Sequence, residues 1–203
     1  MSAVNASSPR IRLFKNERLE KLTLISARAF AIAWGFLLPF IAWIGWESAG
    51  PMEGFGLFAA GLIVWTLFEY VMHRHLFHLE LEQPAVKWLV FLIHGNHHDS
   101  PNDPLRGIMP LSVSLPVAGL IWAACVALIG HAGTWAFLGF ITGYVVYDAI
   151  HYACHQFPMR GKLAAALKRH HMRHHYVDDT RNYAISAIFW DSVFRTRIAS
   201  LKK

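Results

Sequence analysis

Histidine is the residue type through which this chain could do chemistry. The sequence holds 13 histidines among 203 residues, and ten of them fall into four clusters that lie far apart along the chain. Neutral imidazole binds iron, copper, nickel and zinc alike. Loose metal-buffering tracts are contiguous, whereas these clusters are not. The pattern therefore predicts a metal site, for which the candidate ligands are His73 and His78; His94, His97 and His98; His151 and His155; His171, His174 and His175.

The spacing within each cluster indicates how the rings converge. The second and fourth clusters share the spacing H-x-x-H-H, which on a helix places three rings within an arc of about 100°. His151 and His155 are four residues apart and share a helix face. His73 and His78 are five residues apart, about 140° around an ideal helix, so we expect the helix to end or distort between them. Eight to ten imidazoles from four elements suit two metal ions bound close together.

Three further histidines need separate interpretations. His75 lies inside the first cluster, and the spacing alone leaves its role open. His170 precedes the fourth cluster, where the match to H-x-x-H-H favours His171 as the ligand. His131 stands alone in a glycine-rich turn, and we interpret it as solvated polar surface.

Four apolar segments must position these clusters. Hydrophobic residues make up 55% of the chain and charged residues 16%, which excludes a disordered chain and argues against a nucleic-acid partner. The uncharged run 107–147 would form a helix about 61 Å long, twice what a bilayer needs, and glycines at 130 and 133 divide it. We predict membrane-spanning helices at about 29–46, 54–72, 111–129 and 134–150.

The distribution of cations predicts the topology. All 19 Lys and Arg residues lie before the first span, between the second and third, or after the fourth. Cationic loops stay in the cytoplasm, so we expect both termini to be cytoplasmic. The predicted fold is an all-α integral membrane protein, one domain over 1–203, with four transmembrane helices. Residues 73–106 and 151–203 would form a cytosolic helical cap that holds the dinuclear metal site.

The motifs around the histidines resemble those of fatty acid 2-hydroxylases, in the fatty acid hydroxylase and sterol desaturase superfamily. The similar stretches are H-R-H-L-F-H from 73, H-G-N-H-H-D-S-P from 94, Y-D-A-I-H-Y-A-C-H from 147 and H-M-R-H-H-Y from 171, with flanking likeness at 9–14 and 185–194. The resemblance implies membrane helices beneath a cytosolic cap with two metal ions. It also implies that His73 and His78 are the ligands of the first cluster, with His75 as its variable position.

The resemblance further implies an activity, cofactors and partners. The activity would be dioxygen-dependent 2-hydroxylation of the acyl chain of a membrane lipid, such as ceramide or another N-acyl lipid. Two iron ions are the implied cofactor, because zinc, although it can occupy such sites in purified protein, has no redox chemistry. The sequence lacks the His-Pro-Gly-Gly signature of a fused cytochrome domain. We therefore expect an external electron-transfer protein, and favour a bacterial inner membrane over the endoplasmic reticulum.

Other functions remain open from the sequence. A related sterol or carotenoid hydroxylase or desaturase would use similar motifs, and a metal-handling membrane protein would also collect histidines. A transporter, however, needs ionisable groups near the bilayer midplane, whereas Glu69 and Asp148 lie at the ends of predicted spans. We hypothesise that these two carboxylates orient ligand histidines; the alternative is that each marks a membrane interface. Segments 85–93 and 185–194 would form a slot for an acyl chain, or alternatively simple buried helices of the cap.

Overall fold

The computed structural model describes residues 10–199, and this part of the chain consists of helices and the loops between them. Pro9, which belongs to the resemblance noted above, lies outside the described residues, as do the terminal cations Lys202 and Lys203. The expectation of an all-α fold is confirmed for the described part.

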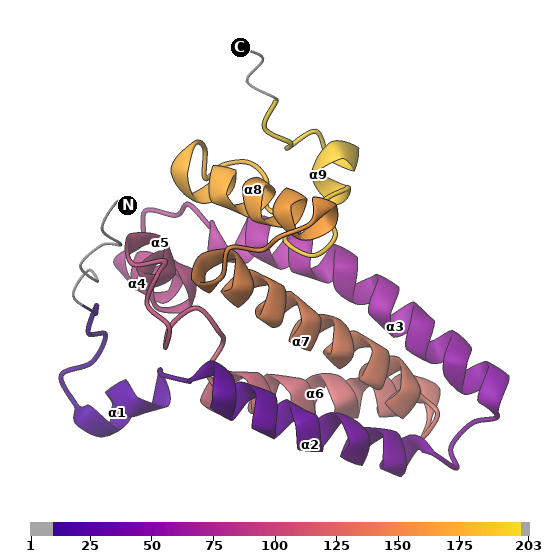
Figure 1. Ribbon diagram of the computed structural model, residues 1–203. Coiled ribbons are helices and arrows are strands. Elements are labelled where there is room, and N and C mark those ends of the chain that lie inside the picture. Colours follow the sequence, from indigo (N-terminus) through magenta and orange to yellow (C-terminus); the bar gives the residue numbers. More distant parts are fainter. Residues whose placement is uncertain (1–9, 200–203) are drawn as a thin grey trace.

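Four long helices form the body of the molecule (Figure 1). They are α2 (Ala27–Gly45), α3 (Pro51–Met72), α6 (Leu111–Ile129) and α7 (Gly133–Gln156). Each corresponds to one predicted span, and the largest disagreement is that α7 continues six residues past 150. Gly130 ends α6 with φ 77°, a conformation that glycine adopts without strain, so the predicted turn lies where it was expected.

Helix α7 is the centre of this bundle, packed against α2, α6 and, most extensively, α3. Two glycines allow the backbones of α3 and α7 to meet. A Cβ atom on Gly61 would overlap the carbonyl oxygen of Ala136, and one on Gly139 would overlap that of Phe58. Close backbone approach through small residues is the usual means of packing helices in membranes. This contact brings the far ends of α3 and α7, and the histidines there, side by side.

Three of the four helices are long and apolar enough to cross a membrane. These are α2, α3 with its extension to Phe77, and α6, and their outer surfaces expose large apolar side chains such as Phe36, Phe55 and Leu120. Helix α7 is not among them. It faces other helices on most of its length, so glycines and the polar-tipped Tyr144 and Tyr147 occupy positions that Leu or Ile would take on an outer helix. The four-span topology therefore stays a prediction.

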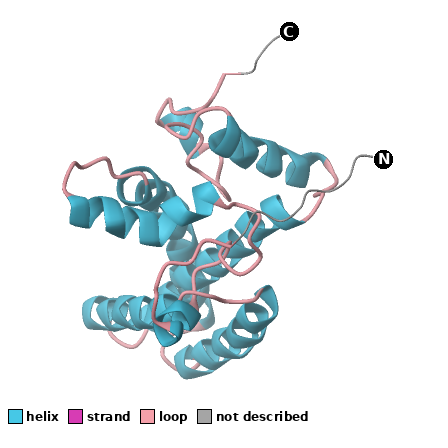
Figure 2. Cartoon of the chain, turned by 90° about the vertical axis from the view of Figure 1, so that its left-hand side faces the viewer, coloured by secondary structure: helices cyan, strands magenta, loops and turns pink. Residues whose placement is uncertain are grey.

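Short elements gather at the end of the bundle where α3 and α7 finish (Figures 1 and 2). They are η1 (His73–Phe77), α4 (Pro84–Val90), η2 (Phe91–Gly95), α5 (Asn96–Asp99), α8 (Lys162–Tyr176) and α9 (Trp190–Val193). The first helix, α1 (Glu17–Leu22), is tied to the loop before α6 by a buried ion pair between Glu20 and Arg106. We call this group the cap.

Candidate metal centre

The first histidine pair is aligned by a change in helix type. Helix α3 passes into the π-helical turn η1, and the backbone N–H of His78 donates to the carbonyl oxygen of His73 at 3.2 Å. An i→i+5 turn holds more residues than an α-turn, so two residues five apart come to lie on one side. The predicted distortion between these two histidines is confirmed, and its form is a π-turn.

The H-x-x-H-H clusters lie on helices, as expected. His94 ends the π-turn η2, His97 and His98 follow in α5, and the last cluster forms the final turns of α8. His151 and His155 belong to the last two turns of α7. All four clusters therefore lie where the bundle meets the cap.

The ten predicted ligands assemble into two groups of five, and within each group the ligand atoms all lie within 4.8 Å of one another. Ring stacking between His98 and His175, with centroids 4.2 Å apart, joins the groups directly. We name them cluster A and cluster B. Cluster A holds His73, His78, His94, His98 and His174; cluster B holds His97, His151, His155, His171 and His175.

Each H-x-x-H-H sequence is divided between the two clusters. In cluster A, His94 and His98 are four residues apart, while His97 between them turns to cluster B. The fourth sequence does the reverse: His171 and His175 join cluster B and His174 crosses to cluster A. Rings at i+3 and i+4 diverge by about 100° around a helix, so one helix can serve two adjacent ions. This division was not foreseen from the sequence.

The Nε2 atoms point into the interior of each cluster. In cluster A, Nε2···Nε2 distances are 3.0 Å for His73–His94, 3.0 Å for His94–His98 and 3.2 Å for His98–His174. Cluster B has the same arrangement, with 2.9 Å for His155–His171, 3.1 Å for His171–His175 and 3.2 Å for His97–His175.

Three backbone carbonyls determine which ring nitrogen carries the proton. His73 donates from Nδ1 to the carbonyl oxygen of Tyr183 at 2.5 Å, and His174 donates from Nδ1 to that of Arg181 at 2.7 Å. In cluster B, His151 Nδ1 donates to the Gly107 carbonyl at 3.0 Å. A proton on Nδ1 leaves the Nε2 lone pair free, which is the usual way a protein presents a ligand histidine.

Burial keeps these rings neutral. It lowers the pKa of His97 and His171 well below the ordinary value, and neighbouring imidazoles lower it further. The same causes bring the pKa of His98 to about 3. For His174, burial again dominates and the pKa falls to about 3. Neutral imidazole is the form that binds a metal ion.

A metal ion in each cluster would satisfy this arrangement. Two ring nitrogens that both lack a proton cannot hydrogen-bond to each other. His73 and His174 nevertheless both present unprotonated Nε2 atoms to the same cluster. His78 Nε2 and His151 Nε2 are buried with no hydrogen-bond partner among the described residues. Nitrogens bound at about 2.1 Å around one ion lie roughly 3 to 4 Å apart, which matches the distances within each cluster. The donor set therefore fits two metal ions.

The remaining histidines lie outside both clusters. The ring of His75 is exposed, and so is that of His131. His170 is buried but donates from Nε2 to Asp191 at 2.8 Å. By position, His171 and not His170 belongs to cluster B, and its role as a ligand stays a prediction.

The two carboxylates expected to orient histidines do not contact them. Glu69 accepts hydrogen bonds from the backbone N–H groups of Ile185, Ser186 and Ala187, at 3.2, 2.9 and 3.2 Å. Asp148 accepts from the backbone N–H of Met109 at 3.3 Å. Each is nearly fully buried and holds a loop. The hypothesis of direct orientation is therefore corrected: the loops, through their carbonyls, contact the rings.

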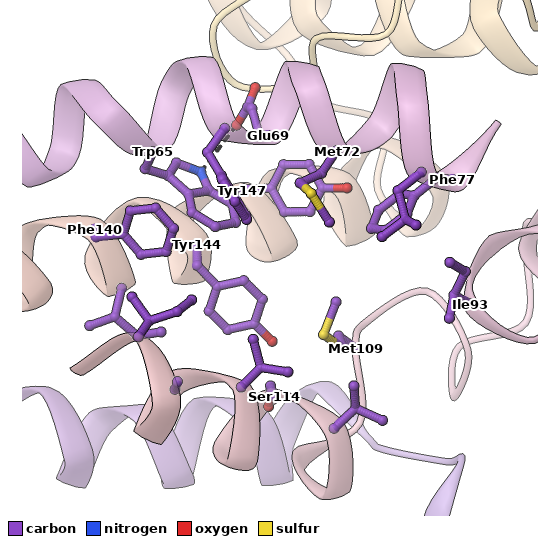
Figure 3. A pocket seen from close by; sticks show the side chains of 17 residues that line it. Trp65, Glu69, Met72, Phe77, Ile93, Met109, Ser114, Phe140, Tyr144 and Tyr147 are labelled. Atoms are coloured by element: carbon purple, nitrogen blue, oxygen red, sulfur yellow. Dashed lines mark hydrogen bonds between the residues drawn. The ribbon is translucent and has the colours of Figure 1, made fainter. Parts of the chain in front are cut away.

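An apolar cavity lies inside the bundle (Figure 3), with about 890 Å³ of empty space when the open solvent at its mouth is counted. Its walls come from α3, α6 and α7, and Trp65, Met72, Tyr144 and Met109 face its interior. A lining residue of the cavity contacts a ring of each cluster. On the side of cluster A, Phe77 stacks on His94 with ring centroids 5.1 Å apart. On the other side, Tyr147 stacks on His151 at 6.1 Å.

The cavity does not lie between the two segments from which the slot for an acyl chain was expected. Of the segments 85–93 and 185–194, only Ile93 lines it. Ile185 and Ala187 are buried beneath Glu69, and Trp190 donates from its indole N–H to Thr66 at 3.1 Å. The chain instead leaves space between α3, α6 and α7, inside the bundle.

Sequence reasoning also missed the supports behind the rings. The carbonyls of Gly107, Arg181 and Tyr183 belong to no motif, because a backbone acceptor leaves no mark on the sequence. Asp191 was passed over although one signal existed: it is a lone carboxylate in an otherwise apolar or neutral stretch, 184–194. Such a residue, wholly buried here, is rare unless it is paired.

Helices that end in two adjacent clusters of five histidines define a class: all-helical proteins with a histidine-rich site suited to two metals. Comparison with known proteins places the chain within it. The sequence profile described as "Fatty acid hydroxylase" matches residues 58–196, which include all ten histidines of the two clusters. The chain belongs to the fatty acid hydroxylase family.

Named relatives agree with this membership. The chain is 31% identical to fatty acid 2-hydroxylase of Macaca fascicularis, over 93% of this chain and 57% of the relative. It is 32% identical to a dihydroceramide fatty acyl 2-hydroxylase of Arabidopsis thaliana, over 91% and 79%. A solved structure described as full-length scs7p, with only the hydroxylase domain visible, superposes with a TM-score of 0.85 at 30% identity, covering 93% of this chain and 72% of the other. The chain thus spans little more than half the length of the macaque relative.

Proposed function

We propose that this protein hydroxylates the carbon next to the carbonyl in the acyl chain of a membrane lipid, ceramide or another N-acyl lipid, using dioxygen. The observation that carries the proposal is the position of the apolar cavity, whose walls contact a ring of each histidine cluster. Family membership and relatives named as fatty acyl 2-hydroxylases support the choice of reaction.

Two iron ions are the cofactor in this proposal. Cluster A and cluster B would each hold one, through the ten histidines predicted as ligands. Bound there, redox-active metal supplies the oxidising power that insertion of oxygen into an unactivated C–H bond requires, and zinc does not. Electrons would come from a separate electron-transfer protein.

The residues of the chain contribute position and exclusion of water. Trp65, Phe68, Phe140 and Ile141 give the cavity an apolar wall along which hydrocarbon gains free energy by leaving water. An acyl chain lying there would extend away from the clusters, with its carbonyl end toward Phe77 and Tyr147. Only carbons near that end would reach the metals, which favours attack close to the carbonyl.

We further propose an integral membrane location with α7 as the fourth crossing and both termini in the cytoplasm. The support is that α7 is about 36 Å long, packs against the candidate spans α2, α3 and α6, and carries no charge before Asp148. The proposed membrane is a bacterial inner membrane, with the endoplasmic reticulum as the alternative.

The test is the lipid mass profile of cells with and without the protein, grown under air. We expect acyl chains one oxygen heavier, with the hydroxyl at the carbon beside the carbonyl, and none from cells that make the His94→Ala variant. A new hydroxyl on a sterol or carotenoid instead would show that the protein is a sterol or carotenoid hydroxylase. No oxidised lipid, despite bound iron and a working reductase, would favour a metal-handling protein and refute the proposal.

A further inference from the structure

The segment 181–184, between α8 and α9, supports two rings of cluster A from behind. The carbonyl of Tyr183 accepts from His73 Nδ1 at 2.5 Å, and the carbonyl of Arg181 accepts from His174 Nδ1 at 2.7 Å. These bonds set both the protonated nitrogen and the direction of each ring. The position of this short segment therefore determines where two ligand nitrogens lie.

The carboxylate of Asp191 is a main anchor of this segment. Oδ1 of Asp191 accepts from the backbone N–H of Tyr183 at 2.9 Å and from the Thr196 hydroxyl at 2.7 Å. Oδ2 accepts from the backbone N–H of Ala184 at 2.9 Å and from His170 Nε2 at 2.8 Å. Four donors fill the four acceptor positions that an ionised carboxylate offers. The side chain is completely buried, so each lost bond would leave an unsatisfied group.

The same network reaches the helix that carries the last histidine cluster. His170 donates to Asp191, and its own carbonyl accepts from Asn182 Nδ2 at 3.0 Å. Because His170 lies in α8 directly before His171, the network fixes the segment relative to α8 as well as to α9. This accounts for a buried histidine that belongs to neither cluster.

We propose that Asp191 is a positioning residue for one of the two metal ions only. It holds segment 181–184 so that His73 and His174 present Nε2 to the ion of cluster A. Within the described residues, no ring of cluster B bonds to this segment. The inference rests on the proposed dinuclear site and adds that the two ions are supported independently.

Cluster B has a support of the same design, which offers a matched comparison. His151 Nδ1 donates to the Gly107 carbonyl at 3.0 Å, and Asp148 accepts from the backbone N–H of Met109 at 3.3 Å. Asp148 therefore stands behind cluster B as Asp191 stands behind cluster A. The support from Asp148 is weaker, because it accepts one bond from its loop, at 3.3 Å, whereas Asp191 accepts two from its segment, each at 2.9 Å.

The test compares Asp191→Asn and Asp148→Asn with the wild-type chain, each purified whole and loaded with iron(II) without oxygen. Bound iron per chain is counted, and the release of each ion to a chelator is followed. Asparagine keeps the shape of Asp191 but points an N–H at a donor. We expect one ion to bind 10- to 100-fold more weakly in Asp191→Asn while the other keeps its affinity. In Asp148→Asn the other ion should weaken, by a smaller factor.

Reference variants identify the ions. His174→Ala removes a ring of cluster A and His151→Ala a ring of cluster B, so the weak ion of Asp191→Asn should be the one lost in His174→Ala. Thr196→Val removes one of the four donors without introducing a clash, and should weaken the same ion by a smaller factor. If Asp191→Asn does not fold, Thr196→Val is the variant that tests the inference.

Two results would overturn the inference while leaving the proposed function intact. One is a wild-type chain with two ions whose affinities are unchanged in both Asp191→Asn and Thr196→Val. The other is equal weakening of both ions, which would show a general structural role for Asp191. A wild-type chain that binds fewer than two ions would refute the proposed dinuclear site itself, and the inference with it.

Discussion

At the scale of residues, the site depends on the direction of single imidazoles more than on their number. His97 and His98 are neighbours in sequence but serve different clusters, and His174 and His175 do the same. A step of one residue along the helix thus decides which of the two clusters a ring joins. A histidine that is present but points elsewhere, such as the exposed His75, adds nothing to either cluster.

His78 and His75 form a matched pair for testing this point. His78→Ala removes the ring whose buried Nε2 points into cluster A, so we expect loss of one bound ion and of turnover. The effect on affinity should exceed the roughly 10- to 100-fold typical of changes behind a ligand. His75→Ala should keep both ions and full turnover, as counted by metal analysis and lipid product. Loss of an ion in His75→Ala would contradict the assignment of His78 instead of His75 to cluster A.

At the scale of elements, the sequence predicts more of the helices than of their contacts. Apolar runs and histidine spacing are local signals, so the long helices and eight of the ten members of the clusters could be predicted from them. The choice of His73 and His78 over His75 came from the family resemblance. The division of each H-x-x-H-H between clusters could not, because it depends on which neighbours face α5 and α8. The π-turn η1 was foreseen as a distortion, since five-residue spacing does not fit an α-helix, but η2 left no such signal.

The α3–α7 contact can be tested with two glycines of the same helix. Gly61→Ala places a methyl group against the backbone of Ala136, and overpacking of this kind costs about 1–3 kcal/mol or more in stability. Gly56 has open space around it, so Gly56→Ala should be neutral or stabilise the helix by up to about 1 kcal/mol. Thermal unfolding in detergent measures both. Equal stability of the two variants would show that the backbones do not approach as described.

The cavity between α3, α6 and α7 predicts a limit on acyl chain length. Ala118 lines the cavity about two turns of α6 beyond its start near the clusters. Ala118→Phe should fill the deep end, so the hydroxylated lipids should shift toward shorter acyl chains while iron content stays the same. Ala124 is exposed on the same helix, and Ala124→Phe serves as the control. An unchanged chain-length profile in Ala118→Phe would place the acyl chain elsewhere.

At the scale of the whole molecule, the clusters lie where the bundle meets the cap. The candidate spans expose apolar side chains along their outer faces, and the cap brings the short elements with histidines over the ends of α3 and α7. In the proposed topology, lipid reaches the cavity from within the bilayer and the electron donor approaches from the cytoplasm. Both would then meet at the two clusters.

The crossing by α7 can be tested with single cysteines in a chain whose Cys125 and Cys154 are replaced. We expect Ser48→Cys and His131→Cys, in the two loops without cations, to react with a membrane-impermeant maleimide on intact cells. Glu82→Cys and Arg160→Cys, in the loops just before α4 and α8, should react only after the membrane is opened. Labelling of Arg160→Cys from outside while Glu82→Cys stays protected would show that α7 does not cross.

The central claim is that ten histidines hold two metal ions side by side, one in each cluster. Its most direct test is the amount of iron bound per chain after loading purified protein with iron(II) without oxygen and removing the excess. The account predicts two ions per wild-type chain, and one in either His174→Ala or His151→Ala. A wild-type chain that binds a single ion, or none, would contradict it.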